Sequence, residues 1–90
     1  MEFEWDPNKA RINFAKHNVS FHEASTVFAD PLSLTFPDPD HSDVETRNIT
    51  IGKSMQGRLL IISHTNRWHR IRIISARRAT RRERKIYENG

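Results

Sequence analysis

The chain has 90 residues, with 15 Lys and Arg, 11 Asp and Glu, and no cysteine. This length fits a single small domain over residues 1–90, and the lack of cysteine excludes disulfides and thiolate zinc sites. No apolar run approaches the ~20 residues that cross a bilayer, and the first residues lack a signal-peptide pattern, so we expect a cytoplasmic protein with no membrane partner.

The charge is divided unevenly along the chain. Residues 1–45 carry nine acids and three bases, whereas residues 46–90 carry two acids and twelve bases. Nine of the fifteen cations lie between Arg67 and Lys85. A concentrated positive surface attracts polyanions and acidic proteins, so RNA, DNA or an acidic partner is the first expectation.

The first elements are predicted to be a strand and a helix. Residues 2–5 alternate polar and aromatic side chains, which is typical of a short strand. Asp6 is a suitable cap for a helix over 7–17, and Asn18 tolerates the left-handed conformation that ends a helix. We expect the buried side of this helix to consist of Ala10, Ile12, Phe14 and Ala15.

A second helix is predicted after Ser20. Ser20 and Glu23 have the spacing of a capping box, in which each residue bonds the backbone of the other. Phe21, Ala24, Val27 and Phe28 follow at helical spacing, and Asp30-Pro31 should end the helix.

Four strands are predicted next. Alternation indicates a strand over 32–36, with Leu32, Leu34 and Phe36 on one side, followed by an exposed, mobile acidic loop that extends to Thr46. Strands over 47–53, 59–65 and 70–76 then form an antiparallel meander. The continuous apolar run Leu59-Leu60-Ile61-Ile62 indicates a central strand covered on both faces.

Thr80 and Glu83 repeat the capping-box spacing and predict a last helix to about Glu88. The element order therefore predicts an α+β domain. Two N-terminal helices should pack on one face of a twisted, mostly antiparallel sheet, made of a short N-terminal strand and a four-strand meander, with a short C-terminal helix.

A set of short segments along nearly the whole chain carries a family resemblance. They are Phe3-Glu4-Trp5-Asp6-Pro7, Lys9-Ala10, Asn13, Lys16-His17, Val19-Ser20-Phe21, Glu23-Ala24, Val27-Phe28, Asp30-Pro31, His41-Ser42, Glu45, Arg47, Ile51-Gly52, Gly57-Arg58, the run from Ile71 to Arg77, Ala79-Thr80, Glu83-Arg84 and Tyr87-Glu88. In residue type and spacing, these segments resemble the BrnT family of bacterial toxins.

The resemblance implies a RelE-like fold and an endoribonuclease that inhibits translation. It also implies a BrnA-type antitoxin with a ribbon-helix-helix DNA-binding region, which would form a hetero-oligomer with the chain and make its contact with operator DNA. The chain departs from the family pattern at Asn66-Arg67-Trp68-His69, where a more polar turn is usual, so Trp68 is a candidate contact for a base or for the antitoxin.

Metal-free RNA cleavage requires a base for the 2′-hydroxyl, cations for the charged phosphorane and an acid for the leaving 5′-oxygen. Arginine suits the phosphate best because its planar fork bonds two oxygens. We predict that Arg47, Arg72 and Arg77 clamp the phosphate. Glu45, His64 and Lys16 are the candidates for proton transfer.

A three-residue loop between Asn66 and Arg70 would pair Arg72 with His64 on one face, with Arg77 on the opposite face. Each of these residues also has a structural interpretation. Arg72 can hold a carboxylate, Glu45 and Arg47 can pair with each other, Lys16 can complement a helix dipole, and His64 can be a core residue.

Further cations are predicted to hold RNA. The RNA-binding candidates are Arg67, Trp68, Arg70, Arg81, Arg82 and Lys85, although the charges of the last helix also fit an ordinary solvated surface. The histidine spacing matches no metal-ligand motif, so we expect neither a metal nor a cofactor. A non-catalytic nucleic-acid-binding or antitoxin-binding module that acts as a co-repressor is the alternative to the ribonuclease.

Overall fold

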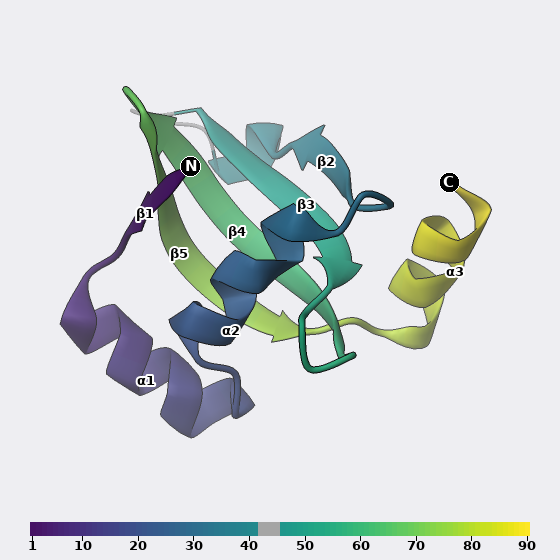
Figure 1. Ribbon diagram of the computed structural model, residues 1–90, viewed down its shortest axis with the longest axis horizontal. Coiled ribbons are helices and arrows are strands. Elements are labelled where there is room, and N and C mark those ends of the chain that lie inside the picture. The colour runs from purple at the N-terminus through teal and green to yellow at the C-terminus, as the bar shows by residue number, and fades with distance from the viewer. Residues whose placement is uncertain (42–45) are drawn as a thin grey trace.

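The computed structural model describes residues 1–41 and 46–90. Its elements in chain order are β1 (Glu2–Glu4), α1 (Pro7–His17), α2 (Phe21–Thr26), the 3-10 turn η1 (Val27–Ala29), β2 (Leu34–Pro37), the 3-10 turn η2 (Pro39–His41), β3 (Arg47–Lys53), β4 (Leu59–Arg67), β5 (Arg70–Arg78) and α3 (Arg81–Asn89) (Figure 1). The predicted order of helices and strands is confirmed. Glu45 and most of the predicted acidic loop that precedes β3 lie outside the described residues.

The strands form one twisted sheet in the order β1-β5-β4-β3-β2 (Figure 1). Strands β2 to β5 are the expected antiparallel meander, and β1 pairs in parallel with β5 at one edge. Strand β4 is central, and its run Leu59-Leu60-Ile61-Ile62 is buried on both faces, as predicted. The predicted strand at Leu32 begins two residues late, because Ser33 N–H closes a turn onto the Asp30 carbonyl and Leu32 is exposed.

Helices α1 and α2 cover one face of the sheet (Figure 1). We call this the helix face and the opposite side the open face. The main core lies between α2 and the helix face and consists of Val19, Phe21, Ala24, Val27, Leu60, Ile62, Ile73 and Ala76. A smaller core on the open face consists of Ile51, Leu59 and Ile61, against which Ile49, Ala79 and Tyr87 pack.

Helix α1 has the predicted ends, but of its predicted buried side only Ala10 packs against the main core. Asp6 caps its start, and Asn18 ends it with a φ of 57°. Ile12 and Phe14 are 62% and 53% exposed, and Ala15 is also exposed. The buried residue is Asn13, whose side chain bonds the N–H and the carbonyl of Ala76 and the carbonyl of Val19. Its amide continues the hydrogen bonding of β5 beyond the end of β1, so a polar contact seats this helix.

Helix α2 shows half of the expected capping box. The Ser20 hydroxyl accepts from the N–H of Glu23 at 3.0 Å. The Glu23 carboxylate instead accepts from Arg58 and from the Ser54 hydroxyl, and the Arg58 hydrogen bonds hold its pKa below the usual value. This buried pair fastens the start of α2 to the β3–β4 hairpin.

Strand β5 contains a bulge that changes the predicted face of its side chains. The β4–β5 turn has two central residues, Trp68 and His69, so Arg72 pairs with Thr65 rather than with His64. Ser75 pairs with Ser63 while His64 pairs with Ile73, which leaves one extra residue in β5. The predicted pairing of Arg72 with His64 is therefore wrong.

The bulge also places Arg72 and Arg77 on the same face. Arg72 is aligned with Thr65 and Arg47, and Arg77 is aligned with Ile61 and Ile51. Arg47 and Ile51 are four residues apart on β3 and therefore share a face, as do their partners. The prediction that Arg77 lies on the opposite face from Arg72 is wrong, because sequence alternation does not count the extra residue.

A candidate active site on the open face

The open face carries a row of polar side chains across four strands. Arg47, Thr65, Arg72 and Glu4 occupy successive strands from β3 to β1. Neighbouring strands are about 4.8 Å apart, so cations project from a rigid surface at regular intervals. Arg77 lies farther along β5 on the same face.

A cavity of about 250 Å³ opens on this face. It is lined by Asp38, Arg47, Ile49, Ile61, Ser63, Ile74, Ser75 and Arg77. Two guanidinium groups, one carboxylate and two hydroxyls thus surround an apolar floor. Such a cavity can hold a phosphate between the two cations and keep a proton acceptor nearby.

Arg77 is held in place by α3. Its Nη1 and Nη2 donate to the two carboxylate oxygens of Glu83, each at 2.8 Å, and Nη1 also donates to the Arg78 carbonyl. Glu83 also completes the capping box with Thr80 that starts α3, as predicted. The Arg77 hydrogen bonds lower the pKa of Glu83 to about 2, so this pair stays charged. Among residues 1–41 and 46–90, the bonds to Glu83 and Arg78 leave Nε–H and one Nη2–H of Arg77 for a further oxygen.

Arg72 has a carboxylate partner. This is the structural interpretation that its sequence position allowed, as the alternative to a phosphate clamp. Its Nη1 donates to Glu4 Oε2 at 2.9 Å. Arg70 approaches Glu2 and Glu4 at 3.9 Å and 3.8 Å. Neither Arg70 nor Arg72 lines the cavity with Arg47 and Arg77.

The two described candidates for proton transfer, His64 and Lys16, do not line the cavity. His64 is 4% exposed and lies on the helix face, where its Nε2 bonds the Thr50 hydroxyl at 2.7 Å and its ring contacts Phe28. Burial lowers the pKa of His64 to about 4, so the imidazole is neutral near pH 7. Lys16 is exposed near the end of α1 and is not a lining residue of the cavity. Of the three candidates, Glu45 is the one that lies outside the described residues.

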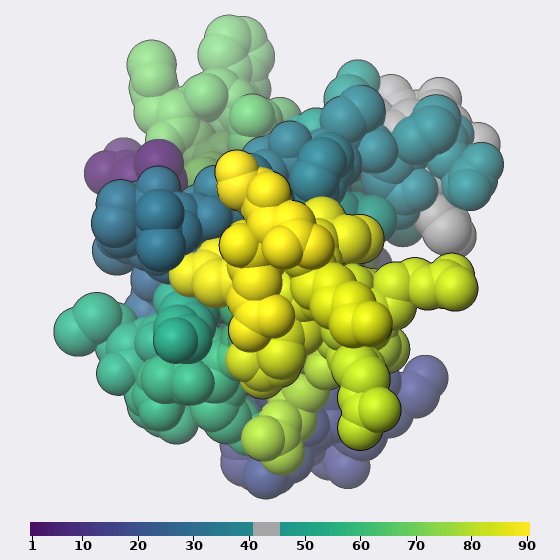
Figure 2. All heavy atoms as spheres, turned by 90° about the vertical axis from the view of Figure 1, so that its right-hand side faces the viewer, coloured from purple at the N-terminus to yellow at the C-terminus, as the bar shows by residue number. Residues whose placement is uncertain are grey.

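The predicted RNA-binding residues form two separate groups. Arg67, Trp68 and Arg70 lie at the β4–β5 turn, where Trp68 is 99% exposed with a φ of 57°. Arg81, Arg82 and Lys85 are exposed on α3, which faces the viewer in Figure 2.

Sequence reasoning missed Asp38, Ser63 and Ser75 as lining residues of the cavity. Asp38 directly follows β2, and its N–H donates to the Arg47 carbonyl at 2.8 Å. Its place at the end of a predicted strand was the sequence signal for it. Ser63 of β4 and Ser75 of β5 carry hydroxyls and pair with each other directly beside the bulge. Their alignment was hidden because the bulge shifts the register.

Residues 1–41 and 46–90 contain no group of three or more acidic or histidine side chains that could hold a metal ion. In the same part of the chain, no helix is long and apolar enough to cross a membrane.

Comparisons with known proteins found a family model and a solved structure that match the chain. The family model described as "Ribonuclease toxin, BrnT, of type II toxin-antitoxin system" matches residues 5–83. The crystal structure of the Brucella abortus ribonuclease toxin BrnT superposes with a TM-score of 0.71 at 21% sequence identity, over 90% of this chain and 99% of that chain. At that identity the similarity shows the fold alone. No curated protein matches the sequence.

Proposed function

Because the chain belongs to the BrnT family of ribonuclease toxins of type II toxin-antitoxin systems, we propose that it is a metal-independent endoribonuclease that inhibits translation. The observation that supports this proposal is the cavity that Arg47 and Arg77 line together on the open face. Two arginines on a rigid sheet provide the charge stabilisation that metal-free phosphodiester cleavage needs.

The proposed reaction is attack by the RNA 2′-oxygen on the adjacent phosphorus. A base removes the 2′-hydroxyl proton, the P–O5′ bond breaks, and the leaving 5′-oxygen takes up a proton, which gives a 2′,3′-cyclic phosphate. Arg47 and the two unused N–H groups of Arg77 would bind the phosphorane oxygens. Asp38 lies in the cavity and joins Glu45 as a candidate for the base.

His64 is not part of the proposed chemistry, because it is buried on the helix face. Arg72, Lys16 and the exposed residues Arg67, Trp68, Arg70, Arg81, Arg82 and Lys85 are proposed to bind the RNA on either side of the cleaved bond. A BrnA-type antitoxin with a ribbon-helix-helix region is the proposed partner, and it would carry the complex to operator DNA in the cytoplasm.

Cleavage in EDTA tests this proposal. We expect the purified chain to cut single-stranded RNA with EDTA present and to leave 2′,3′-cyclic phosphate ends. Arg77→Ala and Arg47→Ala should each lower kcat/KM by about 100-fold, the usual loss of one transition-state donor, with RNA affinity changed only a few-fold. Arg11→Ala, which removes an exposed cation on α1, is the matched control and should change little.

Two results would contradict the proposal. Loss of activity in EDTA with recovery in Mg²⁺ would refute the metal-independent mechanism. Absence of cleavage, with each arginine change weakening RNA binding uniformly and in a salt-dependent way, would favour the non-catalytic binding module. The pairing of Arg72 with Glu4 and of Arg77 with Glu83 is the observation that favours this second candidate.

A further inference from the structure

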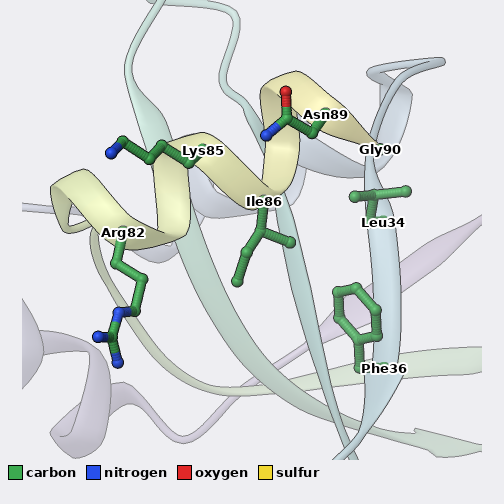
Figure 3. Close-up of a pocket in the computed structure, with 7 residues that line it drawn as sticks. All are labelled: Leu34, Phe36, Arg82, Lys85, Ile86, Asn89 and Gly90. Carbon is green, nitrogen blue, oxygen red and sulfur yellow. The ribbon is translucent and has the colours of Figure 1, made fainter.

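An apolar groove lies between α3 and the edge strand β2. Its volume is about 560 Å³, and its apolar wall consists of Leu34 and Phe36 from β2 and Ile86 from α3. Figure 3 shows the Ile86 side chain extending from α3 beside Leu34 and Phe36. Phe36 and Ile86 are 43% and 44% exposed. A groove of this volume accommodates a few apolar side chains of a bound segment.

Cations border this apolar wall. Arg82 and Lys85 line the groove from α3, as Figure 3 shows. Arg81 and Arg84 lie on the same helix, and none of these four cations has a carboxylate partner among residues 1–41 and 46–90. Arg81 and Arg82 lie in the first turn, where their charge opposes the positive end of the helix dipole, so the helix gains stability when an anion approaches.

The groove is already formed in the isolated chain because α3 is fastened at both ends. The Thr80–Glu83 capping box and the Arg77–Glu83 pair hold its start. Near its end, the Tyr87 hydroxyl donates to Asp30 Oδ2 at 2.7 Å, and the Tyr87 ring packs on the open-face core of Ile51, Leu59 and Ile61. A partner that fits the groove therefore does not need to order α3 first.

We propose that this groove binds an acidic amphipathic segment of the antitoxin, with its apolar side chains against Leu34, Phe36 and Ile86 and its carboxylates on Arg82 and Lys85. This inference rests on the proposed function, since it takes the antitoxin as the partner. RNA fits less well because an apolar wall provides no hydrogen bonds for phosphates or base edges. A second copy of the chain fits less well because two α3 helices would bring like charges together.

The position of the groove explains how such a segment would neutralise the toxin. Arg82 and Lys85 are proposed RNA contacts, so the antitoxin and RNA would compete for them. Glu83 of the same helix holds Arg77 beside the cavity, so the bound segment would end next to the proposed active site.

The experiment measures antitoxin affinity and RNA cleavage in the same set of full-length variants. The probe is the purified antitoxin encoded with the chain, titrated by calorimetry. Phe36→Ser and Ile86→Ser should each weaken antitoxin binding about tenfold or more, as expected for a buried apolar anchor, with cleavage within about twofold of the unchanged chain. Ile12→Ser, at an exposed apolar residue of α1, is the control and should leave both unchanged.

A charge-reversed variant distinguishes a loss of antitoxin contacts from local unfolding of α3. Arg82→Glu combined with Lys85→Glu changes exposed side chains and should weaken antitoxin binding more strongly at low salt than at high salt. Circular dichroism checks the helix content of each variant.

Four results would overturn the inference. They are an unchanged chain that does not bind the antitoxin, antitoxin binding that is unchanged by the groove variants, groove variants that lose RNA cleavage alone, and self-association that Ile86→Ser abolishes. If the chain binds the antitoxin through the groove but cleaves no RNA, the inference stands and the proposed ribonuclease function fails.

Discussion

The two faces of the sheet use alternate residues of the same strands for different purposes. On the helix face, Leu60, Ile62 and Ile73 are at most 1% exposed and pack against α2. On the open face, the same strands present arginines, hydroxyls and a cavity, and α3 covers one part. A face closed by helices supplies stability, whereas a face left partly uncovered has room for charge and substrate.

The bulge in β5 sharpens this difference. It keeps Ile73 and Ala76 together in the core although they are three residues apart. It also brings Arg72 and Arg77 to the open face together. One inserted residue thus serves both faces, and bulges are frequent next to active sites for this reason.

Truncation of one isoleucine on each face should show the largest difference. Ile62→Ala removes a fully buried side chain and should lower the free energy of unfolding by about 3 kcal/mol. Ile74→Ala removes a half-buried side chain beside the cavity and should cost about 1 kcal/mol. Urea denaturation measures both values, and equal losses would refute the distinction between the two faces.

His64, which is buried on the helix face, should make the stability of the fold depend on pH. The pKa of His64 is about 4 in the folded chain and 6.5 when exposed, so the unfolded state binds a proton first as pH falls. Stability is therefore full above pH 6.5 and declines toward pH 4, by about 2 kcal/mol between pH 7 and pH 4.5. His64→Gln should remove this decline, and denaturation at several pH values measures it. His22→Gln, at an exposed histidine, should keep the decline, and a His64→Gln curve with the original slope would contradict the prediction.

The Arg77–Glu83 pair on the open face should also make stability depend on pH, but in a more acidic range and by a smaller amount. The pKa of Glu83 is lowered to about 2, first by its Arg77 hydrogen bonds, so its contribution is present above pH 4.5 and is lost as pH falls toward 2. Glu83→Gln keeps a residue that can form the capping box and removes the charge. Because Arg77 is partly exposed, we expect a loss of about 1 kcal/mol at pH 7. The difference between the two chains should vanish in acid, and a difference that persists below pH 2 would show that the ion pair is not its source.

Most of the fold was predictable because local signals specify it. Asp6, Ser20 and Thr80 cap the three α-helices as their spacing predicts. The buried side of α1 was not predictable, because Asn13 is buried through bonds to Ala76, which is 63 residues away in the sequence. The candidate site was predictable in its residue types, and Arg47 and Arg77 do line one cavity. Asp38 was missed, since its place depends on the pairing of two strands.

The sequence by itself determined the α+β order, the helix ends and the central strand, because these depend on spacing, capping and apolar patterns. It also determined the family, through segments that resemble known members. Tertiary structure alone decided which arginines lie together on one face of the sheet. The β5 bulge set the face of Arg77, and the two-residue turn separated Arg72 from His64. Glu4 of β1, 68 residues away in the sequence, is the carboxylate partner of Arg72. Local patterns specify elements, whereas register and long-range ion pairs depend on packing that no short stretch of sequence contains.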